Sequence, residues 1–187
     1  MADLLLDQQF LTTVLLSGIV AGVPLLYASL GEIVAEQAGV LNVGLEGMML
    51  VGAFVGFVAI LETESLWVGL ISGGVAGALT SLIMVVFCIR LGMDQIVVGI
   101  SIVLTAEGVT SLLHTSWFSR TFPRVPAVDG FAIPLLSDIP VVGPSVFSQP
   151  LPVYVGVALV FVVSWVLRRT SVGLNLRAAG ERPDSLD

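Results

Sequence analysis

The sequence predicts an all-α, polytopic transmembrane helical bundle, and three observations lead to this fold class. Hydrophobic residues make up 56% of the chain and charged residues only 11%, whereas a soluble domain carries about 25% charged residues. Five apolar segments are each long enough to cross a bilayer, which takes roughly 20 residues. A backbone exposed to lipid must satisfy its own hydrogen bonds, and these continuous runs lack the alternation of barrel strands, so we expect helices.

The five predicted spans follow one another with short polar interruptions. They cover residues 10–31, 44–61, 66–89, 95–117 and 151–167. Three of them contain no charged residue, while Glu46 lies in the second and Glu107 in the fourth. We treat residues 1–187 as a single transmembrane domain.

Arginine placement predicts the orientation of these spans. Four of the seven arginines follow the fifth span, at Arg168, Arg169, Arg177 and Arg182. Positive residues are enriched on the cytoplasmic side, so residues 174–187 are expected inside the cell and residues 116–150 form an extracytoplasmic loop. Residues 32–43 are then a cytoplasmic connection. If they instead enter the membrane as a re-entrant or broken helix, the chain makes six membrane passes and the N-terminus moves inside.

Three spans carry two glycines spaced by four residues, which gives each helix a smooth face. Such faces let helix backbones approach closely, and close contact matters in lipid because the solvent supplies little drive for helix association. We therefore predict that these glycines pack the bundle. The pairs are Gly18 with Gly22, Gly52 with Gly56, and Gly73 with Gly77.

Glu107 lies near the middle of the fourth predicted span. A carboxylate at that depth is costly and usually faces the bundle interior or a water-filled path. We take Glu107 as a candidate residue of a translocation path, with the hydroxyls of Ser101 and Thr105 nearby. The alternative is a carboxyl group that is hydrogen-bonded to a neighbouring helix.

Other polar residues favour structural roles. Asn42 is expected to cap the helix of the second span, with Glu46 near its positive end. His114 is the only histidine and no cysteine is near it, so no metal site is predicted. The chain has no lysine and so no nucleotide-binding loop of the Walker type; an ATP-driven process would need another chain.

Three segments carry a family resemblance. Residues 31–49, which include Asn42, Gly44, Glu46 and Gly47, resemble the signature of ABC importer permeases of the branched-chain amino acid, ribose and nucleoside family. Residues 93–100 are similar to a second block of that family, and residues 169–183 resemble its coupling segment. Within the family, the chain looks most like the branch for nucleosides and simple sugars.

The resemblance implies the fold and the partners. The fold would be the type II-like importer fold in a multi-pass protein of a prokaryotic plasma membrane, and this chain would be an N-terminal piece ending in the coupling helix. The chain would not be an enzyme and would bind no cofactor, because ATP is bound by a separate ATP-binding subunit. A second permease subunit and an extracytoplasmic solute-binding protein would complete the importer. The residues implied to couple to the ATPase are Arg177, Ala178, Ala179, Gly180, Glu181, Arg182 and Pro183.

The sequence leaves more than one prediction for the solute and for the class of transporter. Nucleosides or simple sugars are the expected solutes, and branched-chain amino acids are the alternative within the family. Outside it, the chain could be a self-contained carrier or channel gated by Glu107, or a membrane scaffold.

Overall fold

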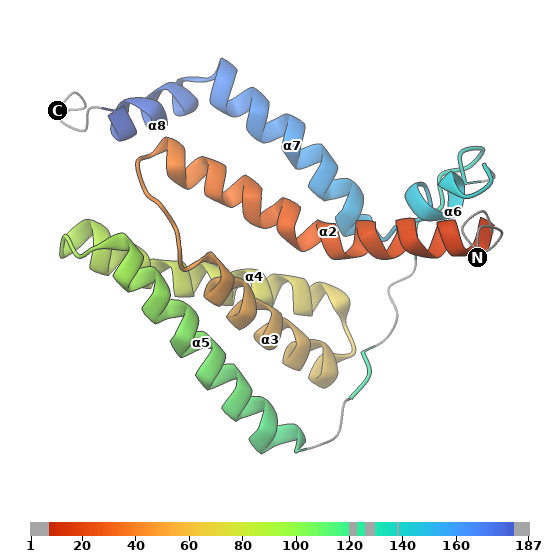
Figure 1. Cartoon of the computed structure of the whole chain (residues 1–187), viewed down its shortest axis with the longest axis horizontal. Coiled ribbons are helices and arrows are strands. Elements are labelled where there is room, and N and C mark those ends of the chain that lie inside the picture. Colours follow the sequence, from red (N-terminus) through yellow and green to blue (C-terminus); the bar gives the residue numbers. More distant parts are fainter. Residues whose placement is uncertain (1–7, 120–122, 126–129, 138, 182–187) are drawn as a thin grey trace. The chain divides into compact units, whose positions relative to one another are not determined.

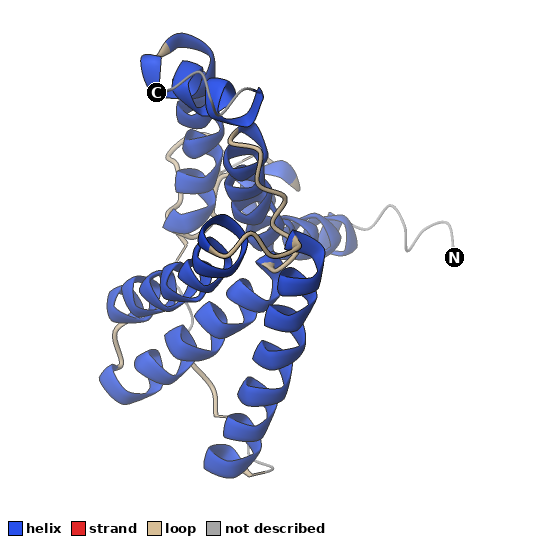
Figure 2. Cartoon of the chain, turned by 90° about the vertical axis from the view of Figure 1, so that its left-hand side faces the viewer, coloured by secondary structure: helices blue, strands red, loops and turns tan. Residues whose placement is uncertain are grey.

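The computed structural model describes residues 8–119, 123–125, 130–137 and 139–181. These residues form helices and connections, with no strand among them (Figure 2). Five helices are long and apolar enough to cross a membrane, which confirms the predicted fold class. They are Gln8–Gln37, Leu45–Thr63, Leu66–Arg90, Gln95–Phe118 and Leu151–Arg169. Each predicted boundary lies within two residues of the observed one, except the end of the first helix.

The chain divides into two compact units (Figure 1). One unit comprises Ala35–Ala127 and holds α3 (Leu45–Thr63), α4 (Leu66–Met84), the π-helix η1 (Val85–Arg90) and α5 (Gln95–Phe118). The other comprises Met1–Val34 and Val128–Asp187 and holds most of α2 (Gln8–Gln37), α6 (Val142–Val146), α7 (Leu151–Arg169) and α8 (Ser171–Glu181).

Helices α3 and α4 run antiparallel and touch through glycines. A Cβ atom added to Gly52 would lie 2.9 Å from the Gly73 carbonyl oxygen, and one added to Gly56 would lie 2.9 Å from that of Gly69. Real Cβ atoms essentially never come so close. The two backbones are therefore in direct contact, as small-residue faces allow in membranes.

Helix α5 begins at a capped end and packs parallel to α3. The Asp94 side chain accepts hydrogen bonds from the backbone N–H groups of Ile96 (2.9 Å) and Val97 (3.0 Å), which satisfies two otherwise unpaired donors. Near this end, a Cβ atom on Gly47 would lie 2.9 Å from the Ile102 carbonyl oxygen. The starts of α3 and α5 thus meet backbone to backbone.

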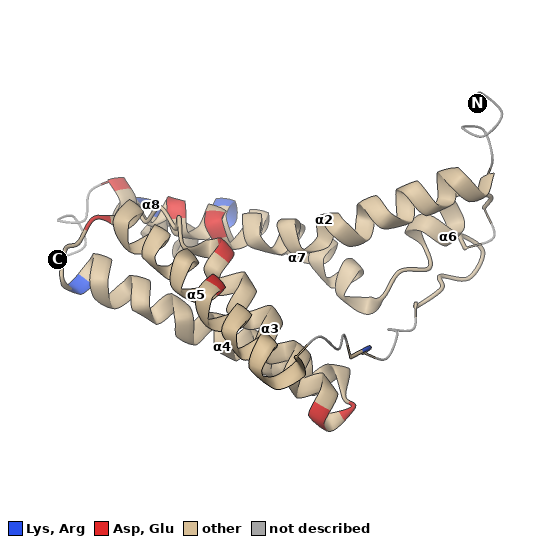
Figure 3. Cartoon of the chain, turned by 60° about the horizontal axis from the view of Figure 1, so that its bottom comes forward, with Lys and Arg blue, Asp and Glu red and all other residues tan. Residues whose placement is uncertain are grey.

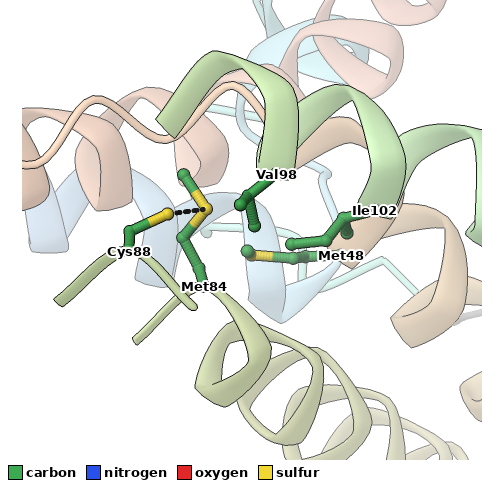
Figure 4. Close-up of a cluster of buried hydrophobic side chains, with 5 residues drawn as sticks. All are labelled: Met48, Met84, Cys88, Val98 and Ile102. Atoms are coloured by element: carbon green, nitrogen blue, oxygen red, sulfur yellow. Dashed lines mark hydrogen bonds between the residues drawn. The ribbon is translucent and has the colours of Figure 1, made fainter. Parts of the chain in front are cut away.

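A small buried cluster joins all four elements of this unit (Figure 4). Met48 of α3, Met84 of α4 and Cys88 of η1 meet Val98 and Ile102 of α5. The Cys88 Sγ lies 3.6 Å from the Met84 Sδ. Flexible methionines fill the irregular space where three helices converge.

In the other unit, α2 is held to α6 and α7. The Tyr27 hydroxyl donates to the carbonyl oxygen of Pro152 at 2.8 Å. The Ser145 hydroxyl of α6 lies 3.3 Å from the carbonyl oxygen of Thr12. The unit thus ties helices that are more than 100 residues apart in sequence.

Two expectations about the first connection are wrong. Residues 32–37 are helical, because Ala, Glu and Gln favour helices and α2 continues through them. Helix α2 ends at Gln37, and Gly39 follows with a φ of 80°. The Gly39 N–H donates to the Glu36 carbonyl and the Val40 N–H to the Ala35 carbonyl, and together these bonds form a Schellman motif. The connection is therefore residues 38–44, with no broken helix in it.

The second error concerns the start of α3. Gly44, not Asn42, is the N-cap residue, and no side chain caps the helix. A Cβ atom on Gly44 would lie 3.3 Å from Ile102 and 3.4 Å from Gly99 of α5. The helix thus begins at a residue that packs closely against α5 and has no side-chain cap.

Candidate functional site

A hollow of about 630 Å³ lies between α3 and α5, and we call it the acidic hollow. Its size is within the range of small-molecule sites, about 300–1,000 Å³. It is lined by Glu46, Gly47, Leu50, Phe54 and Phe57 of α3 and by Val103, Glu107, Thr110, Ser111 and His114 of α5.

Helical periodicity explains why these residues share one hollow. On α3, positions 46, 50, 54 and 57 are spaced by three or four residues, and so are positions 103, 107, 111 and 114 on α5, with 110 next to 111. Residues at such spacing lie along one face of a helix. Because α3 and α5 begin at the same end, the hollow follows the helix axes, with Glu46 near that end and His114 toward the other.

The described residues that line this hollow include two carboxylates and no Lys or Arg. The side chains of Glu46 and Glu107 are both exposed in this chain, and α3, α4 and α5 carry long uncharged stretches around them (Figure 3). An ionisable group inside a membrane span almost always faces protein or water rather than hydrocarbon. This face of α5 is therefore expected to meet a polar path or another protein.

Aromatic rings support the hollow where α3 and α5 end. The ring centroid of Phe54 lies 6.0 Å from that of Trp117, and Phe57 meets Phe118 edge-on at 5.7 Å. The His114 ring lies 5.3 Å from the Phe118 ring. Rings at these separations stabilise one another's orientation. Trp117 and Phe118 therefore help to hold the Phe54 and Phe57 rings in place.

A second hollow of about 400 Å³, which we call the apolar hollow, involves another face of α5. None of its lining residues in the described part of the chain is ionisable. The Ser101 hydroxyl donates to the Val97 carbonyl of its own helix at 2.7 Å. The lining residues are Val51, Thr80, Ile83, Phe87, Met93, Val97, Val98, Ser101, Ile102, Thr105, Ala106 and Val109.

The structure separates the three candidate path residues. Glu107 lines the acidic hollow, while Ser101 and Thr105 line the apolar hollow. Residues 105 and 107 are two positions apart on a helix and so point in nearly opposite directions. Phe54 and Phe57, which sequence reasoning missed, line the acidic hollow instead; aromatic residues are too common in membrane spans for the sequence to mark them.

The predicted glycine pairs have different surroundings. The α3–α4 contact contains three of the predicted glycines, Gly52, Gly56 and Gly73, and also Gly69. A Cβ atom on Gly77 would lie 3.5 Å from the Met48 carbonyl oxygen, which is ordinary contact. Gly69 was missed although it is four residues before Gly73. Gly18 and Gly22 have no neighbour within 4 Å of a Cβ position in their own unit.

The predicted coupling segment is largely helical. Helix α8 begins at Ser171, three residues earlier than expected, and ends with Ala178, Ala179, Gly180 and Glu181; Arg182 and Pro183 lie outside the described residues. The Arg177 guanidinium donates to two carbonyl oxygens, that of Leu167 in α7 at 2.6 Å and that of Gly173 at 3.3 Å. Arg177 thus ties α8 to the end of α7.

The sequence of this chain is similar to those of known permeases. Residues 14–187 match the family described as branched-chain amino acid transport system / permease component. The chain is 35% identical over 172 residues to a putative glucose ABC transporter permease of Haloferax volcanii, covering 89% of this chain and 51% of that protein.

Two further relatives carry nucleoside names. A nucleoside ABC transporter permease of Lactococcus lactis is 34% identical over 88% of this chain and 54% of its own length. A guanosine ABC transporter permease of Bacillus subtilis is 33% identical over 96% of this chain and 59% of its own length. The chain spans about half the length of these relatives, and no solved structure matches it. The match over residues 14–187 shows that this multi-pass membrane chain belongs to the permease-component family of branched-chain amino acid transport systems, whose members are not themselves catalytic.

Proposed function

We propose that the chain is part of the membrane-spanning permease subunit of an ATP-driven ABC importer for nucleosides or simple sugars. The observation that carries this function is the acidic hollow, in a chain whose relatives are named for glucose, nucleosides and guanosine. Exposed carboxylates within spans are suited to a polar path through the bilayer.

The lining of the acidic hollow favours these solutes over branched-chain amino acids. Nucleosides and simple sugars are uncharged and rich in hydroxyl groups, which can donate to a carboxylate. A free amino acid is a zwitterion: its ammonium group would pair with Glu46 or Glu107, but its carboxylate would need a cation of its own. Among the described residues that line the hollow, none is Lys or Arg to pair with that carboxylate.

The importer requires partners. An ATP-binding subunit would bind and hydrolyse ATP, a second permease subunit would complete the pore, and an extracytoplasmic binding protein would deliver the solute. Helix α8 would contact the ATP-binding subunit on the cytoplasmic side. Because Arg177 fixes α8 to α7, movement of α8 would reach the membrane helices as rigid-body motion.

An uptake assay tests this function. The transporter genes would be expressed in cells lacking their own nucleoside and glucose importers, and initial uptake of labelled uridine, glucose and leucine would be measured. We expect uridine or glucose uptake that is lost when the nucleotide-binding lysine of the ATP-binding subunit is replaced by alanine. Uptake of leucine alone, or uptake that survives this replacement, would contradict the proposal.

Co-purification tests the role of α8. Arg177→Glu combined with Arg182→Glu should abolish co-purification of the ATP-binding subunit while membrane insertion stays intact. The matched control, Arg168→Glu with Arg169→Glu, makes the same charge change at the end of α7 and should retain the complex. Equal retention in both double variants would remove α8 from the interface.

A further inference from the structure

We infer that the acidic hollow binds an uncharged nucleoside, with its ribose hydroxyls at Glu107 and its base against Phe54 and Phe57. This inference rests on the proposed function and narrows it to one solute class and one site. It also assigns a role to the aromatic residues, which the resemblance and the comparisons leave without one.

The polar end of the hollow suits a vicinal diol. The Glu107 carboxylate has two oxygens that only accept hydrogen bonds, and adjacent ribose hydroxyls present two donors. Hydrogen bonds to an ionised acceptor are shorter and stronger than neutral ones. Ser111 lies one turn further along α5 and adds a hydroxyl between Glu107 and His114. The Thr110 hydroxyl donates to the Ala106 carbonyl of its own helix at 2.7 Å, so it can offer only an acceptor to the solute.

The aromatic end suits a planar base. Phe54 and Phe57 line the hollow, while Trp117 and Phe118 contact their rings and are not among the lining residues. Every nucleobase has a π-face, so stacking on such rings tolerates different bases. His114, whose ring contacts Phe118, lies seven residues beyond Glu107, roughly 10 Å along the helix. The aromatic end of the hollow is therefore separated from Glu107 by enough space for a sugar and a base.

The charge of the described lining disfavours phosphorylated solutes. Glu46 and Glu107 give the hollow two carboxylates, and none of the lining residues within the described ranges is Lys or Arg. Phosphate groups are normally held by cations or helix N-termini. A nucleoside monophosphate would be repelled where the nucleoside is accepted.

The test compares discrimination ratios in the assembled transporter. Initial uptake of labelled uridine would be measured alone and in competition with unlabelled 2′,3′-dideoxyuridine, uridine monophosphate and glucose, at equal membrane levels of each variant. The binding protein also discriminates, but it is the same in all variants, so its contribution cancels when ratios are compared. The variants are Glu107→Gln and Phe57→Leu.

Matched controls use the same substitutions elsewhere in the unit. Glu62→Gln changes an exposed carboxylate near the end of α3, and Phe87→Leu removes a ring from the apolar hollow. Both should keep the wild-type KM for uridine and the wild-type preference for uridine over its dideoxy analogue.

The expected result is specific to the acidic hollow. Glu107→Gln should reduce the preference for uridine over the dideoxy analogue by roughly tenfold or more, the worth of one charge-assisted hydrogen bond. Phe57→Leu should raise the KM for uridine severalfold and leave that preference unchanged. Uridine monophosphate should not compete in the wild type.

The outcomes separate the inference from the proposed function. Uridine uptake with both variants equal to their controls would overturn the inference and leave the importer function standing. Glucose uptake without uridine uptake would do the same. Absence of both uptakes in the wild type would contradict the proposed function itself. If Phe57→Leu fails to insert, Glu107→Gln and its control still decide the polar half.

Discussion

Two faces of α5 differ in the surroundings that each can accept. One face presents Glu107 and His114 to the acidic hollow, and the other presents Ser101 and Thr105 to the apolar hollow. The Ser101 hydroxyl is already bonded to its own helix, so lipid or apolar protein can cover that face. An exposed carboxylate cannot be covered in this way at tolerable cost. Hydroxyls bonded to their own helix occur on both faces, at Ser101 and at Thr110. Within this span, therefore, the carboxylate of Glu107 distinguishes the pathway face from the packing face.

The largest difference between the two faces is expected when the polar group is removed from each face in turn. Glu107→Leu should lower the initial rate of solute uptake by roughly 10- to 100-fold, because charge-assisted hydrogen bonds to the solute are lost. Thr105→Val, which also replaces a polar group by an apolar one, should stay within about twofold since it leaves the acidic hollow intact. Equal losses in both variants would erase the distinction between the faces.

The α3–α4 contact also affects the acidic hollow, because it positions α3, the helix that carries Phe54 and Phe57. Gly73→Ala should lower the free energy of unfolding in detergent by about 1–3 kcal/mol, since its Cβ would lie 2.7 Å from the Gly52 carbonyl oxygen. Gly74→Ala has no neighbour within 4 Å of its Cβ and should be neutral or gain up to about 1 kcal/mol in helix propensity. Chemical unfolding of both variants measures the difference, and equal stability would contradict direct backbone contact at Gly73.

A smaller effect is expected at the start of α5, where Asp94 fixes the first turn. Asp94→Ala should cost about 1 kcal/mol of unfolding free energy, because two backbone N–H groups lose their acceptor. Asp94→Asn keeps an acceptor oxygen and should cost only a few tenths of a kcal/mol. If alanine and asparagine proved equivalent, the cap would have no part in holding α5.

Much of the fold could be predicted from the sequence, since span length and the absence of charge determine where helices can cross a bilayer. The end of α2 was misplaced because Glu32 and Glu36 suggested a polar loop, whereas both are compatible with a helix that Gly39 terminates. The start of α3 was misplaced because Asn42 is a good cap by local chemistry, while the observed N-cap is Gly44, which packs closely against α5.

The site was predicted only in part, for a different reason. Glu107 stood out because a single charge in an apolar span is conspicuous. Its neighbours across the hollow come from α3, about 50–60 residues earlier in the chain, and their pairing depends on how α3 and α5 pack. Glu46 was predicted to lie at the helix start and in the family signature, and it also lines the acidic hollow.

Cysteine accessibility is the most direct test of whether the acidic hollow belongs to the transport path, because it reports which face of α5 meets water. Cys88 is the only cysteine and would first be replaced by serine. Single cysteines would then be introduced as Glu107→Cys and Ser111→Cys on one face and as Ser101→Cys and Thr105→Cys on the other. The assembled transporter in membranes would be treated with a charged, membrane-impermeant methanethiosulfonate reagent. We predict rapid modification at positions 107 and 111, slowed by added solute, and little at positions 101 and 105. Equal or reversed modification of the two faces would contradict the assignment of the acidic hollow to the transport path.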